Sequence, residues 1–248
     1  MFIWMKTEKT KKDKPFHFKQ FSLHDSRCAM KIGTDAVLLG SYAAGFESDK
    51  ILDVGTGSGI IALMIAQKTG KIIHAIDIDA AAVEQAAENF SKSPWAHYMQ
   101  AFHCSLQEFV PEESIKYDLI VSNPPYFQNS LKSKNIQRTT ARHDQNLKLG
   151  DFFYFSEKLL DKKGIIVTIT PYNLRIENEY SANKSMLYLN KQLIIKPNLK
   201  LQPVRIIQVF SRIPAQDFNS ETLCIEKNKR NDFSDEYRNL TRDYHPFL

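Results

Sequence analysis

Residues 51–59, with the sequence Ile-Leu-Asp-Val-Gly-Thr-Gly-Ser-Gly, decide the fold of this chain. The first four of them form an apolar run typical of a short buried strand, and the following residues, 60–67, predict an apolar helix. Gly55, Gly57 and Gly59 let the intervening backbone pass close to a ligand and leave the amino terminus of the helix exposed. The spacing lacks the third glycine of a dinucleotide fingerprint. It therefore suits a nucleoside or a carboxylate better than a pyrophosphate.

Strands and helices alternate on both sides of this turn. Strands are predicted at 72–76, 98–103, 119–122 and 165–170, and helices at about 34–42, 80–90, 106–109 and 152–159. We expect Thr34 or Asp35 to cap the first of these helices and Gly164 to end the last. Three later strands, at 193–196, 204–211 and 222–226, have no clear helix between them. The pattern predicts an α/β fold with a mostly parallel sheet, helices on both faces and an antiparallel edge.

The composition is that of an ordinary globular protein with a small excess of positive charge. The 248 residues are 43% hydrophobic and carry a formal net charge of +5, and no apolar run reaches the roughly 20 residues that span a bilayer. Three cysteines, Cys28, Cys104 and Cys224, lie far apart without a C-x-x-C motif. This argues against a disulfide framework or a metal site and for reduced thiols in the cytoplasm. Lysines crowd residues 6–19, so residues 1–15 are expected to be a disordered basic tail.

Two further features follow strands of the predicted sheet. Asp77 ends the strand after the glycine turn, where a carboxylate is placed to accept hydrogen bonds from a ribose diol. The run Asn123-Pro124-Pro125-Tyr126-Phe127 follows the strand at 119–122. The two prolines have no backbone N–H and must end that strand in a stiff turn. Read alone, the glycines are compatible with a structural turn, and the prolines with a strand terminator beside core aromatics.

The Asn-Pro-Pro-Tyr turn fits transfer of a methyl group to an exocyclic amine. The lone pair of such an amine is conjugated into the base and is a poor nucleophile. Two acceptors, the Asn123 side-chain oxygen and the Pro124 carbonyl, can bind both amino hydrogens and favour pyramidal nitrogen. Tyr126 or Phe127 can stack on the face of an extruded base. Positioning then supplies most of the catalysis.

The glycine turn followed by Asp77 resembles the motif of class I S-adenosylmethionine-dependent methyltransferases. That resemblance implies S-adenosylmethionine as the cofactor and a Rossmann-like sheet of seven strands. In that family an acidic or amide residue after the third strand often holds the adenine amino group, whereas this chain has Ser105 there. The Asn-Pro-Pro-Tyr tetrapeptide resembles that of amino-methyltransferases acting on adenine, cytosine or glutamine nitrogen.

A narrower resemblance is to the bacterial tRNA1(Val) adenine-37 N6-methyltransferases. It rests on the residues at 18–21, 27–35, 38–40, 88–89, 93–96, 122–126 and 141–143. It implies a single methyltransferase domain at 16–248, with an N-terminal segment that covers the cofactor and a C-terminal extension. The implied substrate is the adenine just 3′ of the anticodon in the anticodon loop of tRNA(Val), and Thr34 and Asp35 lie beside the methionine end of the cofactor.

These arguments assign three sets of residues. The expected catalytic residues are Asn123, Pro124, Pro125 and Tyr126. The expected cofactor-binding residues are Thr34, Asp35, Asp53, Gly55, Gly57, Gly59, Asp77, Ser105 and Asn123. The expected substrate-binding residues are Tyr126, Phe127, Arg138 and Arg142, the last two in a basic loop after the turn. No metal is expected.

Two other classes of function remain open from the residues. One keeps the chemistry and changes the acceptor to a DNA or rRNA base or to a protein glutamine. The other is an RNA-binding protein with an inactive methyltransferase fold. The intact glycine turn, Asp77 and the Asn-Pro-Pro-Tyr turn argue against the second, and no segment is long enough for a separate target-recognition domain.

Overall fold

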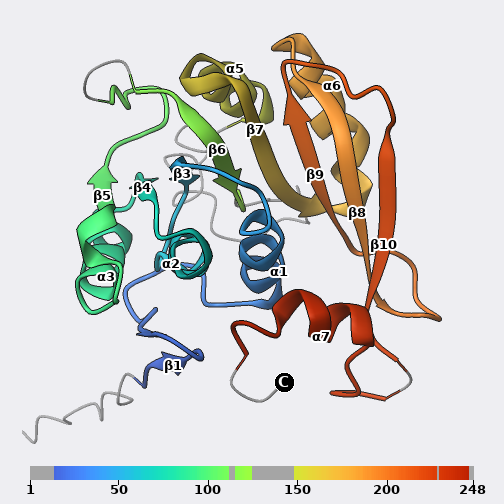
Figure 1. Ribbon diagram of the computed structural model, residues 1–248, viewed down its shortest axis with the longest axis horizontal. Helices are drawn as coiled ribbons and strands as arrows, with labels where there is room; N and C mark the ends of the chain where they lie inside the picture. Colours follow the sequence, from blue (N-terminus) through green and yellow to red (C-terminus); the bar gives the residue numbers. More distant parts are fainter. Residues whose placement is uncertain (1–13, 112–114, 125–147, 228, 246–248) are drawn as a thin grey trace, which may run out of the picture.

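A central β-sheet organises the computed structural model, which describes residues 14–111, 115–124, 148–227 and 229–245 (Figure 1). The strands lie in the order β10-β8-β9-β7-β6-β3-β4-β5. Their bounds are β3 Lys50–Val54, β4 Ile72–Asp77, β5 Met99–His103, β6 Tyr117–Ser122, β7 Leu160–Pro171, β8 Tyr188–Asn198, β9 Arg205–Ser211 and β10 Asn219–Glu226. A separate short hairpin pairs β1, Phe16–His17, with β2, Ser22–Leu23.

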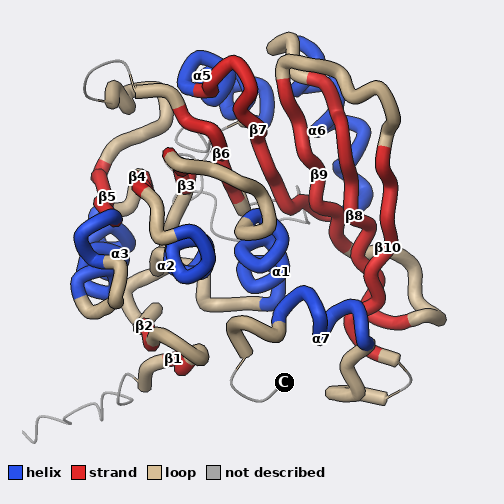
Figure 2. Tube along the Cα trace, viewed as in Figure 1, coloured by secondary structure: helices blue, strands red, loops and turns tan. Residues whose placement is uncertain are grey.

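Helices cover both faces of this sheet (Figure 2). Their bounds are α1 Thr34–Ala43, α2 Ile60–Thr69, α3 Ala80–Ser91, α5 Leu149–Leu159, α6 Arg175–Lys184 and α7 Asp235–Thr241, with short 3-10 turns at Ala96–Tyr98 and Tyr172–Leu174. Helices α1, α2, α3 and α7 share one buried cluster with the sheet, and α5 and α6 share the cluster on the other face. The chain therefore has three layers, as the alternation of strands and helices predicts.

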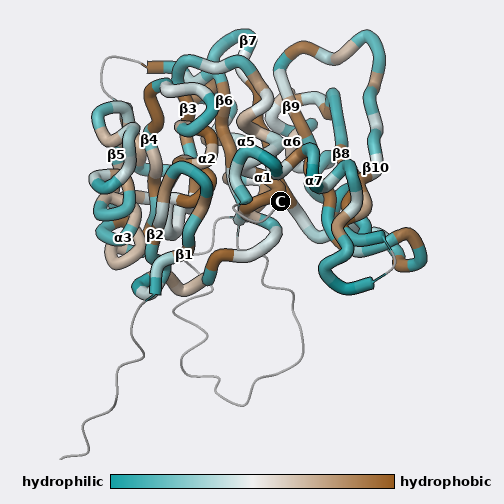
Figure 3. Tube along the Cα trace, turned by 60° about the horizontal axis from the view of Figure 1, so that its bottom comes forward, coloured by the Kyte–Doolittle hydropathy of each residue, from teal (hydrophilic) through white to brown (hydrophobic). Residues whose placement is uncertain are grey.

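The central strands are buried on both faces, and their sequences are correspondingly apolar. Leu119, Ile120 and Val121 in β6 are fully buried, and this strand is strongly hydrophobic in Figure 3. Strands β3, β4, β5, β6 and β7 are mutually parallel. Their carboxyl ends therefore meet at one edge of the sheet, which is where ligands bind in open α/β folds.

The predicted fold class is confirmed, but the sheet differs from the prediction in two details. Within the described residues it contains eight strands instead of seven, because β10 pairs in parallel with β8 at the outer edge. The antiparallel strand is β9, which lies between β7 and β8 instead of at the edge. Strands β8, β9 and β10 do alternate in direction along the chain. In the sheet, however, β8 lies beyond β9, so the other side of β8 pairs with the parallel strand β10.

Three local predictions were wrong. Helix α1 begins after Gly33, and no side chain caps it. Residues 106–108 form a turn instead of a helix. Gly164 lies inside β7 instead of ending α5, which stops at Leu159. A Cβ atom on Gly164 would come within 2.6 Å of the Tyr117 carbonyl oxygen, so this glycine permits close contact between β7 and the irregular start of β6.

The two ends of the described chain meet on helix α2. The Tyr244 hydroxyl donates a hydrogen bond to the Met64 carbonyl (3.0 Å), and the Gln67 side chain donates to the Asp243 carbonyl (2.7 Å). The Lys19 backbone N–H donates to the Tyr244 carbonyl (2.9 Å). Asp243 and Tyr244 therefore hold both α2 and the backbone at Lys19. Among the helices that the structure describes, none combines the length and the hydrophobicity needed to cross a membrane.

Candidate active site

The sequence-predicted residues form a row along the carboxyl edge of the sheet. Ser122 of β6 pairs with Val54 of β3, Val54 pairs with Ile76 of β4, and Asp77 pairs with His103 of β5. Asn123, Gly55, Asp77 and Ser105 consequently follow or occupy the ends of four adjacent strands. Neighbouring strands are about 4.8 Å apart. The predicted acceptor turn and the predicted cofactor turn thus lie side by side.

A hydrogen bond fixes the acceptor turn to the cofactor turn. The buried Ser122 hydroxyl donates to the Val54 carbonyl at 2.8 Å, one residue before Asn123 on one strand and Gly55 on the other. Asn123 is half-buried and Pro124 is buried. Pro125, Tyr126, Phe127, Arg138 and Arg142 lie outside the described residues, so their assignments stay predictions.

The glycine turn has the shape of a cradle. Gly55, Gly57 and Gly59 all have positive φ angles, of 73°, 55° and 80°. At Gly55 and Gly57, no heavy atom lies within 4 Å of where a Cβ atom would be. The Asp77 carboxylate holds the turn, because it accepts a hydrogen bond from the Gly57 N–H at 2.9 Å. The backbone therefore leaves open space beside a carboxylate that faces the turn.

Gly59 has a different reason to be glycine. A Cβ atom there would meet the Phe90 ring at 2.4 Å, so α2 can begin beside α3 only without a side chain at this position. The role of Gly59 is to let the turn pack on α3. A ligand contact is not needed to explain it.

Replacing Gly59 by alanine should destabilise the fold by about 3 kcal/mol. A left-handed backbone conformation costs an alanine about 1 kcal/mol, and overpacking against Phe90 adds about 2 kcal/mol. Gly70→Ala is the matched control, because Gly70 also has a positive φ angle but no atom within 4 Å. Denaturant unfolding measures both variants. Equal losses at the two positions would contradict the packing role, whereas partial rescue by Phe90→Leu would support it.

Asp53 stabilises the glycine turn from the buried end of β3. Its side chain is fully buried, and one carboxylate oxygen accepts a hydrogen bond from the Thr56 hydroxyl at 2.7 Å. Burial raises the pKa of Asp53 to about 7, with a further increase from the nearby Asp77 charge, against the opposing hydrogen bond from Thr56. Through its bond with Thr56, Asp53 fixes the conformation of the turn. A direct contact between Asp53 and the cofactor stays a prediction.

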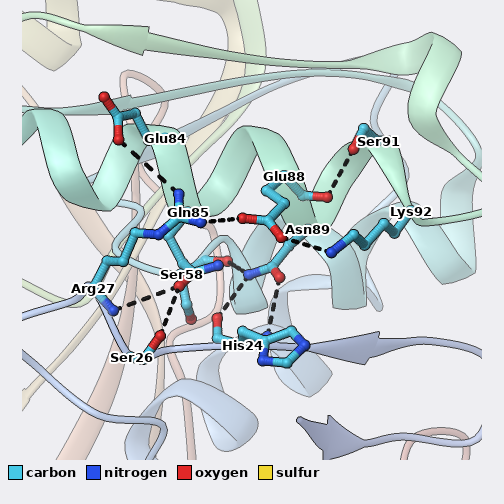
Figure 4. Close-up of polar contacts among 10 residues, drawn as sticks. All are labelled: His24, Ser26, Arg27, Ser58, Glu84, Gln85, Glu88, Asn89, Ser91 and Lys92. Atoms are coloured by element: carbon cyan, nitrogen blue, oxygen red, sulfur yellow. Dashed lines mark hydrogen bonds and ion pairs between the residues drawn. The ribbon is translucent and has the colours of Figure 1, made fainter. Parts of the chain in front are cut away.

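The N-terminal segment at 24–33 packs against the glycine turn, and Asn89 makes the connection (Figure 4). The buried Asn89 amide donates to the Ser58 carbonyl (2.8 Å) and to the His24 carbonyl (2.8 Å), and it accepts from the His24 N–H (3.0 Å). One side chain on α3 thus binds both the turn and the segment. The sequence alone assigns Asn89 no role, although residues 88–89 are among those that carry the family resemblance.

Arginine and lysine side chains hold the same segment. Arg27 forms an ion pair with Glu88 on α3 (Figure 4), and Lys31 donates to the Asp25 carbonyl at 2.6 Å. Cys28 is buried in the segment. Burial raises the pKa of the Cys28 thiol to about 11, with smaller contributions from Asp25 and Asp77.

Ser105 is joined to a carboxylate three residues later. Its hydroxyl donates to the Glu108 side chain at 2.7 Å, and this bond holds the pKa of the exposed Glu108 carboxyl below its usual value. The Cys104 N–H donates to the Asp77 carbonyl at 3.1 Å, which ties this turn to the end of β4. An acidic group is therefore present beside Ser105, although it comes from Glu108.

Thr34 and Asp35 lie on the other side of the acceptor turn. The Asp35 carboxylate forms an ion pair with Arg205 at 2.8 Å. Arg205 belongs to β9, and in the sheet β7 and β6 lie between it and the strands of the cofactor turn. Sequence reasoning did not find Arg205, because the two partners are 170 residues apart and no local pattern links them.

The described residues have features that match a nucleoside cofactor. No group of three or more histidine, cysteine, aspartate or glutamate side chains in the described part of the chain is arranged to hold a metal ion. The open cradle at Gly55 and Gly57 and the Asp77 carboxylate beside it match a ligand with a ribose diol. Backbone N–H groups at the start of α2 add a favourable partial charge for a carboxylate.

Comparisons with known proteins agree with this geometry. Residues 26–177 match the family model described as the methyltransferase small domain. A protein of Parabacteroides distasonis named tRNA1(Val) (adenine(37)-N6)-methyltransferase is 42% identical over 230 residues, which is 93% of this chain and 97% of the relative. A protein of Flavobacterium johnsoniae with the same name is 39% identical, over 93% of this chain and 98% of the relative.

Solved structures share the fold at low sequence identity. A predicted O-methyltransferase from Agrobacterium tumefaciens aligns with a TM-score of 0.63 and 14% identity, over 85% of this chain and 96% of that chain. A T. Thermophilus 16S rRNA methyltransferase in complex with AdoMet and guanosine aligns with a TM-score of 0.55 and 17% identity, over 81% of this chain and 50% of that one. These similarities establish a methyltransferase fold and no particular substrate.

Proposed function

The chain belongs to the methyltransferase small domain family and, within it, to the tRNA1(Val) (adenine(37)-N6)-methyltransferases, and we propose that it methylates N6 of adenine 37 in tRNA1(Val). The proposed methyl donor is S-adenosylmethionine. The observation that carries the proposal is the row of Asn123, Gly55 and Asp77 on three adjacent strand ends. The proposed amine-binding turn thus lies beside the proposed nucleoside-binding turn, which supports a displacement between two bound molecules.

The proposed cofactor site is formed by residues on β3, β4 and β5. The backbone at Gly55 and Gly57 would hold the cofactor, with the Asp77 carboxylate accepting hydrogen bonds from its ribose hydroxyls. Ser105 and Glu108 lie at the next strand end, where an adenine amino group would be bound. Asp53 and Gly59 act indirectly, since the first holds the turn and the second permits its packing. When bound, the cofactor supplies an electrophilic methyl group.

The proposed acceptor site is formed by the Asn123 turn. The Asn123 side-chain oxygen and the Pro124 carbonyl accept hydrogen bonds from the target amine and direct its lone pair toward the methyl donor. Pro125 offers no competing N–H, and Tyr126 or Phe127 stacks on the base. The product ammonium is acidic, so it loses its proton without a strong general base. Arg138 and Arg142 are proposed to bind tRNA phosphates.

Thr34 and Asp35 are proposed to border the methionine end of the cofactor, at the start of α1. The Arg205 ion pair would then hold Asp35 in place without a ligand. Residues 16–248 are proposed to form one domain in which the segment at 24–33 covers the cofactor. A cytoplasmic location is proposed, because the relatives are named as tRNA-modifying enzymes.

Mass spectrometry of tRNA nucleosides tests the proposed reaction. Unmodified tRNA(Val) is incubated with the protein and methyl-labelled S-adenosylmethionine, and the nucleosides are separated after digestion. We expect labelled N6-methyladenosine, and its loss when adenine 37 is replaced by guanine. Label in a DNA or rRNA base, or in protein glutamine, with none in tRNA would refute the proposed substrate. The absence of saturable S-adenosylmethionine binding, together with no methyl transfer, would favour an inactive RNA-binding fold.

A further inference from the structure

A cluster of basic and apolar side chains lies at the carboxyl edge of the sheet, beyond the Asn123 turn. It consists of Tyr172, Arg175, Lys196, Leu199, Lys200 and Leu201, which we call the loop patch. Strand β7 is parallel to β6, and β8 runs in the same direction because both are antiparallel to β9. The residues after β7 and β8 therefore emerge at the same edge as Asn123 (Figure 1).

The strand register gives the position of the loop patch relative to the acceptor turn. Ser122 pairs with Thr168 of β7, so Tyr172 lies one strand over and four residues further in the strand direction, about 13 Å at 3.3 Å per residue. Pro171 is level with Arg205, which is level with Ile195 on β8. Lys196 is thus three strand spacings to the side of β6. The patch lies about 20 Å from Asn123.

The cations of the loop patch are held in place but are not neutralised. The Arg175 guanidinium lies 4.4 Å from the centre of the Tyr172 ring and donates to the Tyr172 carbonyl at 3.2 Å. Lys196 donates to the Leu199 carbonyl at 3.2 Å. Within the described ranges, Arg175, Lys196 and Lys200 take part in no ion pair, and neither do Glu177 and Glu179 on the adjacent helix α6.

Two cations at the opposite edge of the sheet are neutralised. There Lys71 pairs with Asp49 at 2.7 Å, and Arg212 pairs with Glu157 at 2.9 Å. Lys162 and Lys163 on that edge take part in no ion pair among the described residues, so the loop patch is distinguished by lying on the same edge as Asn123. Leu199 and Leu201, at 66% and 51% exposed, stand among these charges. The Asn198 side chain accepts from the Lys200 and Leu201 N–H groups (3.0 and 3.1 Å) and so gives the loop a defined shape.

We propose that the loop patch binds the tRNA backbone that flanks the methylated adenine. This inference rests on the proposed function, because it takes a folded RNA as the substrate. Phosphates near the target base would bind Arg175, Lys196 and Lys200, and exposed leucines would contact ribose or base faces of unpaired nucleotides. Phosphate contacts fix the register and orientation of a nucleic acid without reading its sequence. The patch thereby orients the stem-loop whose adenine enters the Asn123 turn.

Charge reversal at Lys196 and Lys200 tests the inference. The K196E/K200E variant should raise the KM for tRNA at least tenfold, with kcat changed less than twofold and cofactor affinity unchanged. The slope of the logarithm of the tRNA binding constant against the logarithm of salt concentration should become shallower by about two, one for each lost phosphate contact. The matched control is K162E/K163E, since both lysines are exposed at the amino edge, at the start of β7. Its KM should stay within twofold of the original protein.

The outcomes distinguish failure of the loop patch from failure of the proposed function. Methylation of tRNA by the original protein, with the same KM in K196E/K200E and in the control, overturns the loop patch and leaves the proposed function intact. Failure of the original protein to methylate tRNA overturns both. The neutral variant K196Q/K200Q should raise KM in the same direction by a smaller factor, so it provides the test if charge reversal impairs folding.

Discussion

The Asn123→Ala variant is expected to lose methyl transfer to tRNA by about a thousandfold and to bind S-adenosylmethionine within a few-fold of the original protein. A rate loss of this size corresponds to about 4 kcal/mol of transition-state stabilisation, which is typical of a removed oriented dipole in a closed site. In the proposed site the amide oxygen is one of two acceptors for the target amine, and alanine would leave only the Pro124 carbonyl. The Ser122–Val54 hydrogen bond does not involve Asn123, so the turn should keep its place.

Single-turnover methylation and cofactor titration measure these two quantities separately. Asn219→Ala is a matched control, because Asn219 is exposed at the amino end of β10, on the opposite edge of the sheet. Full activity of Asn123→Ala would show that another group directs the amine. A large loss of cofactor affinity would instead place Asn123 mainly in the cofactor site.

The Asp77→Ala variant should weaken cofactor binding about a hundredfold or more. Asp77 accepts hydrogen bonds from the Gly57 N–H (2.9 Å) and from the Asp79 N–H (3.0 Å), and it faces the space left by the glycines. Its removal would cost the proposed contacts to the ribose hydroxyls and would also release the Gly57 N–H that it holds. Hydrogen bonds to a charged group contribute about 1.5–3 kcal/mol each, and 1.4 kcal/mol is tenfold in affinity.

Asp79→Ala is the control for Asp77→Ala, because it removes a nearby carboxylate but keeps the proposed cofactor contact. Asp79 caps α3 through the Ala81 N–H at 3.0 Å, so its replacement should reduce stability by about 1 kcal/mol and leave cofactor affinity within a few-fold. Calorimetric titration of both variants, together with thermal unfolding, makes the comparison. Equal affinity of the Asp77 variant and the original protein would remove Asp77 from the cofactor site.

The positions of residues that follow the local strand-and-turn pattern were predictable from the sequence. The glycine turn, Asp77 and Asn123 each follow a short apolar run, and parallel strands bring such positions to one edge whatever the intervening length. The order of the strands along that edge decides which residues become neighbours. The sequence does not state this order, although the family resemblance implies it.

Contacts between distant segments could not be predicted in this way. Asn89 joins His24 to Ser58 from a helix face that reads as ordinary amphipathic surface. Arg205 binds Asp35 across 170 residues. Gly164 looks like a helix terminator, yet its need for space comes from the Tyr117 carbonyl on another strand. Tertiary packing decides all three, and local propensity says nothing about it.

The hydrogen bonds of Asp243 and Tyr244 on α2 have a consequence for synthesis of the protein. The ribosome adds these residues only after residues 219–226, the last strand of the sheet, have been made. Until then, α2 lacks its partners at Met64 and Gln67, and the Lys19 backbone N–H lacks its acceptor. Domains form as units once their contacts are available during translation. Helix α2 and the backbone at Lys19, although made before most of the sheet, therefore gain these contacts only after all its described strands have been synthesised.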